Sequence, residues 1–160
     1  MSTVVEHDRS STDLEIASVA GAERHVVAVV LECRGRLALL KRSAAVHHDQ
    51  GRWHCVTGYL EPGHTPLQQA MEELFEETGL RLVDLVALAP GRVLTIPDGK
   101  DTRWHVHTFR AVTQQRRLIM NWEHDAYRWT TRRGVCRFDG QVAWLPQVIE
   151  AVDDSRAQRS

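Results

Sequence analysis

The stretch 58–80, GYLEPGHTPLQQAMEELFEETGL, places four glutamates and no lysine or arginine on one short predicted helix. At about 100° per residue, Glu73, Glu76 and Glu77 fall within one quadrant of that helix. Glu72 lies beside Glu76. All four carboxylates lie in the last two turns, where the helix dipole disfavours anions and like charges four residues apart repel each other. The pattern therefore indicates a site for a cation rather than a helix arranged for stability.

The residues around this helix favour a metal site over a solvated acidic face. The loop that leads into it is rich in glycine and proline, and Pro66 suits the first helical turn. Gly79 suits the position after the last turn, so a helix is predicted over 66–78. We expect one apolar stripe to pack on the core: Leu67, Ala70, Met71, Leu74 and Phe75. The acidic side then offers the oxygen ligands that Mg²⁺ prefers, with substrate phosphates completing its coordination.

The segment 58–80 resembles the Nudix box, the motif of the Nudix hydrolases. The family pattern is Gly, five residues, Glu, seven residues, then Arg-Glu-apolar-x-Glu-Glu-x-Gly-apolar. The length agrees, and six positions are in register: Glu73, Leu74, Glu76, Glu77, Gly79 and Leu80. The resemblance covers nearly all of residues 25–153 and implies an α/β fold, the Nudix α/β/α sandwich with a central mixed sheet. It also implies Mg²⁺ or Mn²⁺ as the cofactor.

Two positions depart from the family pattern. His64 stands where the family has glutamate, and Glu72 stands where it has arginine. In relatives that Glu and Arg are thought to pair and to hold a neighbouring metal-binding glutamate in place. His64 and Glu72 would keep an ion pair of reversed polarity when the histidine is protonated, which we call the exchanged pair. The alternative is a decayed motif that no longer supports hydrolysis.

Length and composition limit the other classes of function. The 160 residues suit one domain with a sizeable core. The net charge is −1 and the basic residues are dispersed, so polymeric DNA or RNA is not an expected partner. Cys33, Cys55 and Cys136 are widely spaced and odd in number, which argues against a disulfide framework and a structural zinc site. Without an apolar signal segment or a membrane-spanning run, we expect a cytoplasmic protein with no membrane partner.

The chain divides into three predicted parts. Residues 1–22 are expected to be a flexible arm and residues 154–160 a polar tail, because both lack periodic apolar residues. The Nudix domain would occupy 23–153. Its predicted elements besides the acidic helix are strands at 25–33, 36–42, 53–60 and 81–90, two strands within 91–112 that meet at a turn over 97–99, a short strand within 121–131, and a helix at about 141–153.

Four residues outside the acidic helix are candidates for binding substrate. Arg42 closes a predicted strand, where similar proteins often have a basic residue that reaches phosphate, although a solvated strand end is the alternative. Trp53 lies shortly before the glycine turn and suits core packing or stacking on a nucleobase. His105 and His107 share a strand face, which suits contacts to phosphate or a transition-metal pair. Without a third ligand, two hydrogen-bonded, half-buried histidines are the simpler interpretation.

Glu123 is the best candidate ligand outside the helix. The segment NWEHDAYRW at 121–129 resembles a Glu-His-x-x-Tyr-x-Trp segment of some Nudix pyrophosphohydrolases, including those acting on dihydroneopterin triphosphate. In those enzymes the glutamate contributes to the metal site, so the resemblance implies the same role for Glu123. The sequence VTG at 56–58, followed by Glu61, also resembles that branch. Without the resemblance, a surface acid would be the simpler interpretation of Glu123.

The resemblance implies a pyrophosphatase-type hydrolase that cleaves a diphosphate linkage in a nucleoside triphosphate or a related small phosphorylated metabolite. The metal ligands it implies are Glu73, Glu76, Glu77, Glu123 and the Thr57 carbonyl, which would lower the pKa of a metal-bound water. The candidate catalytic groups are Glu73, Glu77, Glu123 and His64. Two alternatives stay open: a domain that binds a phosphorylated metabolite without turnover, and a specialised reaction that uses His64. Nudix proteins often form dimers, so a homodimer is a further expectation.

Overall fold

The computed structural model describes residues 22–159, so the arm expected over 1–22 lies almost entirely outside the described residues. Seven strands form one mixed sheet. They are β1 (Ala22–Cys33), β2 (Arg36–Arg42), β3 (Trp53–His54), β4 (Val56–Tyr59), β5 (Leu85–Pro97), β6 (Thr102–Thr113) and β7 (His124–Thr130). The other elements are helices α2 (Pro66–Thr78) and α3 (Leu145–Arg159) and two short 3₁₀ helices, η1 (Leu82–Asp84) and η2 (Arg133–Arg137).

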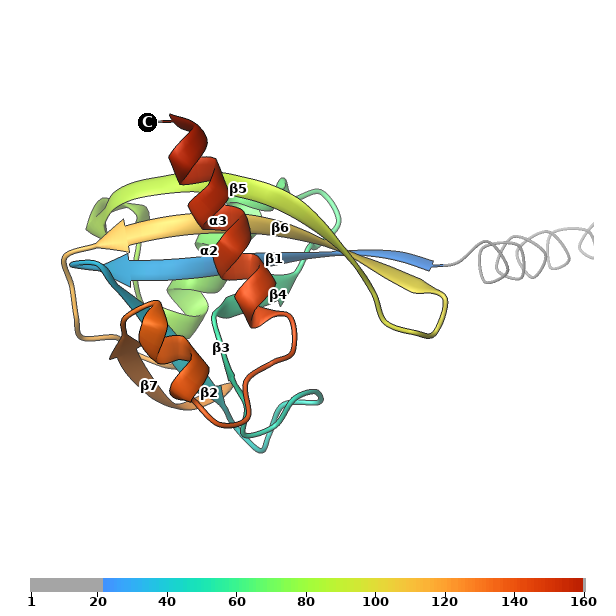
Figure 1. Ribbon diagram of the computed structural model, residues 1–160, viewed down its shortest axis with the longest axis horizontal. Helices are drawn as coiled ribbons and strands as arrows, with labels where there is room; N and C mark the ends of the chain where they lie inside the picture. Colours follow the sequence, from blue (N-terminus) through green and yellow to red (C-terminus); the bar gives the residue numbers. More distant parts are fainter. Residues whose placement is uncertain (1–21, 160) are drawn as a thin grey trace, which may run out of the picture.

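Strand β1 is the centre of the sheet because it pairs with three neighbours. It runs parallel to β6 and antiparallel to β2 and β4. Alternate residues of β1 enter two separate cores, with Val27 and Val29 on the side of α2 and Val26 and Val30 on the side of α3. Figure 1 shows the sheet between the two helices. A strand buried on both faces requires a continuous apolar run, which explains the sequence of β1 and confirms the α/β/α sandwich.

Four predicted elements differ from the observed ones. The strands predicted at 81–90 and in the first part of 91–112 are one strand, β5, whose pairing with β6 shifts register between Pro90 and Val93. Gly91 lies at this irregularity, and a Cβ there would come within 2.4 Å of Thr108 Oγ1. The strand predicted at 53–60 is divided into β3 and β4. Helix α3 begins later than predicted and continues to Arg159, through most of the expected tail.

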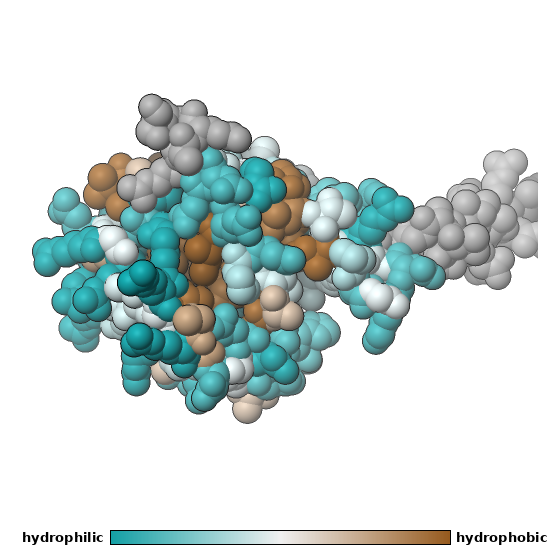
Figure 2. Space-filling view, viewed as in Figure 1, coloured by the Kyte–Doolittle hydropathy of each residue, from teal (hydrophilic) through white to brown (hydrophobic). Residues whose placement is uncertain are grey.

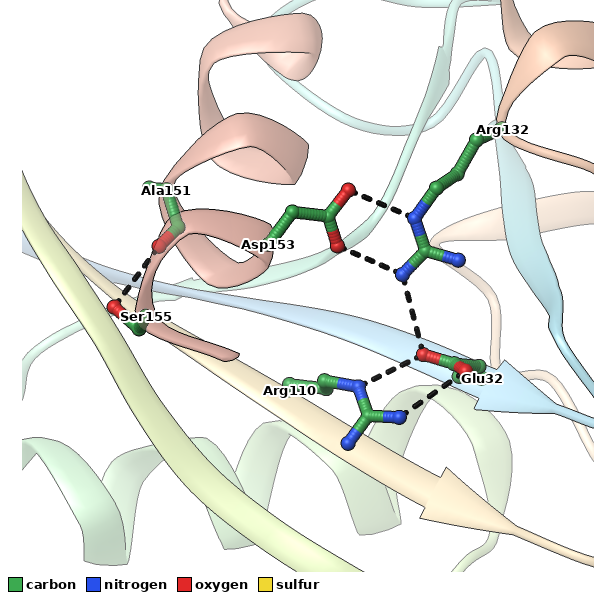
Figure 3. Close-up of polar contacts among 6 residues, drawn as sticks. All are labelled: Glu32, Arg110, Arg132, Ala151, Asp153 and Ser155. Atoms are coloured by element: carbon green, nitrogen blue, oxygen red, sulfur yellow. Dashed lines mark hydrogen bonds and ion pairs between the residues drawn. The ribbon is translucent and has the colours of Figure 1, made fainter. Parts of the chain in front are cut away.

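A chain of ion pairs joins α3 to the sheet (Figure 3). Glu32 of β1 accepts hydrogen bonds from Arg110 of β6 at 2.9 and 3.1 Å. Arg132 reaches Glu32 at 3.4 Å and donates two hydrogen bonds of 2.8 Å to Asp153 of α3. Burial alone would raise the pKa of Glu32, but Arg110 and then Arg132 hold it below its usual value. The network therefore satisfies a buried carboxylate entirely within the chain.

The surface over α3 is mainly hydrophilic, with an apolar strip near the centre of the face in view (Figure 2). Among residues 22–159, we find no helix of the length and apolarity that crossing a membrane requires. Cys33, Cys55 and Cys136 are all free, in agreement with the prediction that their spacing and odd number do not suit a disulfide framework.

Candidate active site

Helix α2 begins and ends where neighbouring residues satisfy its terminal backbone groups. Thr65 Oγ1 accepts a hydrogen bond from the Gln68 N–H at 3.2 Å, and Gln68 Oε1 accepts one from the Thr65 N–H at 2.9 Å. At the other end, Gly79 adopts a φ of 76° and its N–H donates to Phe75 O at 2.8 Å. The predicted bounds 66–78 are confirmed, and the acidic last turns are held in a regular helix.

The side of α2 nearest the sheet carries a row of polar residues spaced four apart: Gln69, Glu73 and Glu77. Their exposed fractions are 0%, 9% and 0%. Ala70 and Leu74 are buried beside this row, as predicted. The predicted burial is wrong for Leu67 and Phe75, which are 45% and 48% exposed. Phe75 instead lies 5.6 Å from the Arg81 guanidinium. The helix is therefore turned so that two acids, not two large apolar side chains, face the sheet.

Gly58 of β4 leaves the space that the Glu73 carboxylate occupies. A Cβ at position 58 would lie 2.1 Å from Glu73 Cδ, so any larger residue there would displace the carboxylate. Gln69 holds Glu73 from the other side, because its Nε2 donates to Glu73 Oε1 at 3.0 Å. Gln69 Oε1 in turn accepts from the Glu61 N–H at 3.1 Å. Gln69 is not among the residues predicted from the sequence, where its only signal is an amide one helical turn before a glutamate.

Glu123 and the glutamates of α2 form one electrostatic cluster. Burial, with smaller contributions from Glu76 and Glu123, raises the pKa of Glu73 to about 7. Burial raises the pKa of Glu77 well above its usual range, and Glu73 and Glu123 add to the rise. Partial burial, Glu72 and Glu123 raise the pKa of Glu76. The structure thus brings Glu123, from the loop before β7, to the predicted ligands on α2.

Glu77 is a buried acid whose charge no cationic side chain of the described residues offsets. Neither carboxylate oxygen has a hydrogen-bond partner among the described residues. His124 Nε2 lies 3.6 Å from Glu77 Oε1. However, burial and the charge of Arg42 lower the pKa of His124 to about 4, so this imidazole is neutral at pH 7. Only the backbone of Thr57 acts to lower the pKa of Glu77. Buried, unpartnered carboxylate oxygens beside three further acids fit a hard divalent cation.

The two residues of the exchanged pair lie in contact. His64 Nδ1 is 3.3 Å from Glu72 Oε2 and 3.8 Å from Glu61 Oε2. His64 Nδ1 also lies 2.8 Å from Gln69 Oε1. Because this Gln69 atom already accepts from a backbone N–H, it is an oxygen, and His64 Nδ1 must be the donor. The histidine is therefore connected through Gln69 to Glu73, and its part in catalysis stays a prediction.

Arg42 and Trp53 lie in different surroundings. Arg42 pairs with His124 across β2 and β7, and its Nε donates to His48 O at 3.0 Å. Its charge lowers the pKa of His124, which places the guanidinium near the acidic cluster. Trp53 packs edge-on against Phe138, with ring centroids 5.0 Å apart, in the core on the side of α3. Packing accounts for Trp53, and its contact with a substrate stays a prediction.

His105 and His107 are joined by a third histidine that the sequence analysis did not select. His25 Nδ1 lies 3.0 Å from His107 Nε2, and the His25 ring stacks on His105 with centroids 4.8 Å apart. Burial, together with His25 and His105, lowers the pKa of His107. In the sheet, Val27 pairs with both His107 and Gly58. His107 therefore lies about 10 Å, two strand spacings, from Gly58 beneath Glu73, and His25 lies on the strand between them.

Comparisons with known proteins agree with this geometry. Residues 21–151 match the family model described as NUDIX domain. The chain is 37% identical to an octanoyltransferase of Myxococcus xanthus over 114 residues, which are 66% of this chain but only 30% of that protein. It is 28% identical to the bis(5'-nucleosyl)-tetraphosphatase [asymmetrical] of Rattus norvegicus over 116 residues, 71% of this chain and 76% of that protein. Its fold resembles the dihydroneopterin triphosphate pyrophosphohydrolase of E. coli, with a TM-score of 0.64 and 23% identity, over 83% of this chain and 99% of that one.

Proposed function

The chain belongs to the Nudix family, and from this premise we propose that it is a divalent-metal-dependent hydrolase of a diphosphate linkage in a nucleoside triphosphate or related small phosphorylated metabolite. The observation that carries the proposal is Glu77, a fully buried carboxylate with no hydrogen-bond partner in the described chain. A buried carboxylate without a partner lowers the stability of the fold. In a family of hydrolases, a role in the active site explains why such a residue is kept.

The acidic cluster supplies the ligands for the ion. These are Glu73, Glu76, Glu77 and Glu123, with the Thr57 carbonyl of β4, which the family resemblance implies, as a further candidate. When bound, Mg²⁺ or Mn²⁺ offsets the charge of phosphoryl oxygens and lowers the pKa of a water. Without the ion, burial and then repulsion from the neighbouring carboxylates raise the pKa values of Glu73, Glu76 and Glu77.

We assign the proton transfer to Glu73, with Glu123 as the alternative base. A general base works best when its pKa lies near the operating pH, and the pKa of Glu73 is about 7 before metal binds. Gln69 holds one oxygen of this carboxylate at 3.0 Å and so fixes its orientation. Glu77 is less suited to the task because it is completely buried.

His64 and Glu72 are positioning residues in this proposal. His64 Nδ1 already faces Gln69 Oε1 and Glu72 Oε2, so the proton on this nitrogen is engaged in holding the helix entrance. Through Gln69, that contact orients Glu73, which is the role the Glu and Arg of the family pattern are thought to have. The contacts favour this role over direct proton transfer by His64.

The substrate contacts we propose come from β1, β2 and β6. Arg42 lies near the acidic cluster and would bind phosphate oxygens. His105 and His107 share a sheet face with the cluster and, with His25, would contact a more distant part of the substrate. Because the rat relative is a bis(5'-nucleosyl)-tetraphosphatase, bis(5'-nucleosyl) tetraphosphates join the nucleoside triphosphates as candidate substrates.

The experiment is a hydrolysis assay on a panel of nucleoside triphosphates, dinucleoside polyphosphates and pterin triphosphates with Mg²⁺ or Mn²⁺, read by phosphorus NMR. We expect Glu77→Gln to reduce the rate by roughly 100-fold or more. Glu150→Gln, an exposed position on α3, is the matched control and should keep wild-type rates. Equal rates in Glu77→Gln and the wild type would refute the proposal. Thermal stabilisation by a panel compound without turnover would instead favour a binding domain.

A further inference from the structure

A cavity of about 220 Å³ lies at the opposite end of β2 from the acidic cluster. Its lining residues are Cys33, Arg34, Arg36, Arg116 and Trp129. Arg36 is the first residue of β2 and Arg42 the last, a separation of about 20 Å along the strand. Because Arg42 pairs with His124 beside Glu77, the cavity is separate from the proposed metal site.

Three exposed arginines line this cavity, and none of them has a carboxylate partner among the described residues. In the part of the chain that the structure describes, the side chains of Arg34, Arg36 and Arg116 take part in no ion pair. Arg110 and Arg132, by contrast, are each paired with acids at 3.4 Å or less. Like charges gathered at one cavity repel one another, so an anion placed among them would be attracted to all three.

The backbone holds two of these arginines in a tight hairpin. Arg34 and Gly35, between β1 and β2, have φ values of 51° and 79°, and Cys33 pairs with Arg36 across the turn. The left-handed conformation favours glycine or asparagine, so an arginine at position 34 is unfavourable for the turn itself. Opposite the hairpin, Trp129 Nε1 donates to Arg116 O at 2.9 Å and fixes the loop that carries the third arginine.

We propose that this cavity binds a small phosphate-type oxyanion, with inorganic pyrophosphate or phosphate as its ligand class. The planar guanidinium matches the geometry of phosphate oxygens and forms short, charge-assisted hydrogen bonds with them. At about 220 Å³ the cavity is smaller than the roughly 300–1,000 Å³ of pockets for larger organic ligands. It therefore suits an ion of a few heavy atoms better than a whole nucleotide.

The test is calorimetric titration of the full chain with inorganic pyrophosphate in EDTA, so that no metal recruits phosphate to the acidic cluster. We expect saturable binding at one site, weakened about tenfold or more in Arg36→Gln/Arg116→Gln. Arg103→Gln/Arg137→Gln removes the same charge from two exposed positions outside the cavity and should bind within about twofold of the wild type. Glu77→Gln should also leave the affinity unchanged, which separates this site from the proposed function.

Spectroscopy locates the bound ion. The indole N–H resonance of Trp129, assigned through Trp129→Phe, should shift with the same saturation curve as the heat. Titrations with phosphate and sulfate then rank the anions, with pyrophosphate expected to bind most tightly. Absence of saturable binding at millimolar pyrophosphate would overturn the proposal. An equal loss in the Arg103→Gln/Arg137→Gln control would overturn it too, because the binding would then follow net charge alone.

Discussion

Two charged clusters lie on opposite faces of the sheet, and the buried carboxylate of each has different partners and a different pKa. On the side of α3, Glu32 is buried but lies within hydrogen-bonding distance of Arg110, and its pKa is lowered. On the side of α2, Glu77 is buried with no hydrogen-bond partner in the described chain, and its pKa is raised. In the first cluster, the chain itself supplies the cationic partners of the buried carboxylate. The second has no such partner among the described residues, which supports our proposal that it binds a divalent cation.

The largest expected effect comes from breaking the cluster around Glu32. Arg110→Met removes the two hydrogen bonds of 2.9 and 3.1 Å to the buried Glu32 carboxylate, and we expect it to lower the free energy of unfolding by about 3 kcal/mol. Urea denaturation monitored by circular dichroism measures the change. Arg103→Met, at an exposed position of the same strand β6, is the control and should change stability by less than about 0.5 kcal/mol. A similar loss in both variants would show that Glu32 does not depend on its pairing.

Removing a charge from the cluster around Glu77 should have the opposite sign. Glu77→Gln eliminates the unpaired buried charge, so we expect the metal-free protein to gain about 2 kcal/mol of unfolding free energy at pH 8. The measurement is denaturation in EDTA, with Glu150→Gln as the matched control. Mg²⁺ should stabilise the wild type and have a smaller effect on Glu77→Gln. A destabilised Glu77→Gln in EDTA would mean that the chain already compensates this carboxylate.

Glu73 and the neighbouring His124 are expected to change the stability of the metal-free protein in opposite directions as the pH rises. The folded pKa of Glu73, about 7, lies above the ordinary value of 4.5. The metal-free protein should therefore lose stability through this group as pH rises from 4.5 to 7. Buried His124, with a pKa lowered to about 4, acts in the opposite direction, since its stability contribution grows between pH 4 and 6.5.

The difference between wild type and Glu73→Gln isolates the glutamate from this opposing effect. After discounting for solvent screening, we expect the variant to gain about 2 kcal/mol relative to wild type between pH 4.5 and pH 7.5 in EDTA. Gln69 can still donate to the glutamine at position 73, so the local hydrogen bond survives. A difference that does not change with pH would show that Glu73 keeps its ordinary pKa.

The smallest effect is expected from the exchanged pair. Both side chains are partly exposed, at 35% and 40%, so a double-mutant cycle on His64→Ala and Glu72→Ala should give a coupling of about 0.5 kcal/mol in stability. The same cycle read in Mg²⁺ affinity tests the positioning role through Gln69. Coupling near zero in both readouts would leave the two departures from the family pattern independent.

The metal-site candidates could be predicted from the sequence because helical periodicity and the box spacing are local properties. Pro66, Thr65 and Gly79 bound the helix where the sequence pattern predicts. The orientation of α2 could not be predicted in the same way. Leu67 and Phe75 were expected to be buried but are exposed, because the space above Gly58 admits Glu73 rather than a larger apolar side chain.

Contacts between segments distant in the sequence could not be predicted from the local residue pattern either. His25 joins His107 across 82 positions, and its pairing follows from the parallel register of β1 and β6. The two strands predicted within 81–97 merge because an irregularity at Pro90 lets pairing with β6 continue. Such register depends on the whole sheet and not on local propensity.

By itself, the sequence determined the class of this protein and the chemistry of its acidic helix, since both follow from residue types at fixed spacing. Only the tertiary structure decided which acids are compensated. Glu32 and Glu77 are equally ionisable in an unfolded chain, but folding places Arg110 beside the first, whereas no cationic side chain within residues 22–159 is paired with the second. The free energy of a buried charge is set by its three-dimensional neighbours, and these are what make one carboxylate structural and the other available for a metal.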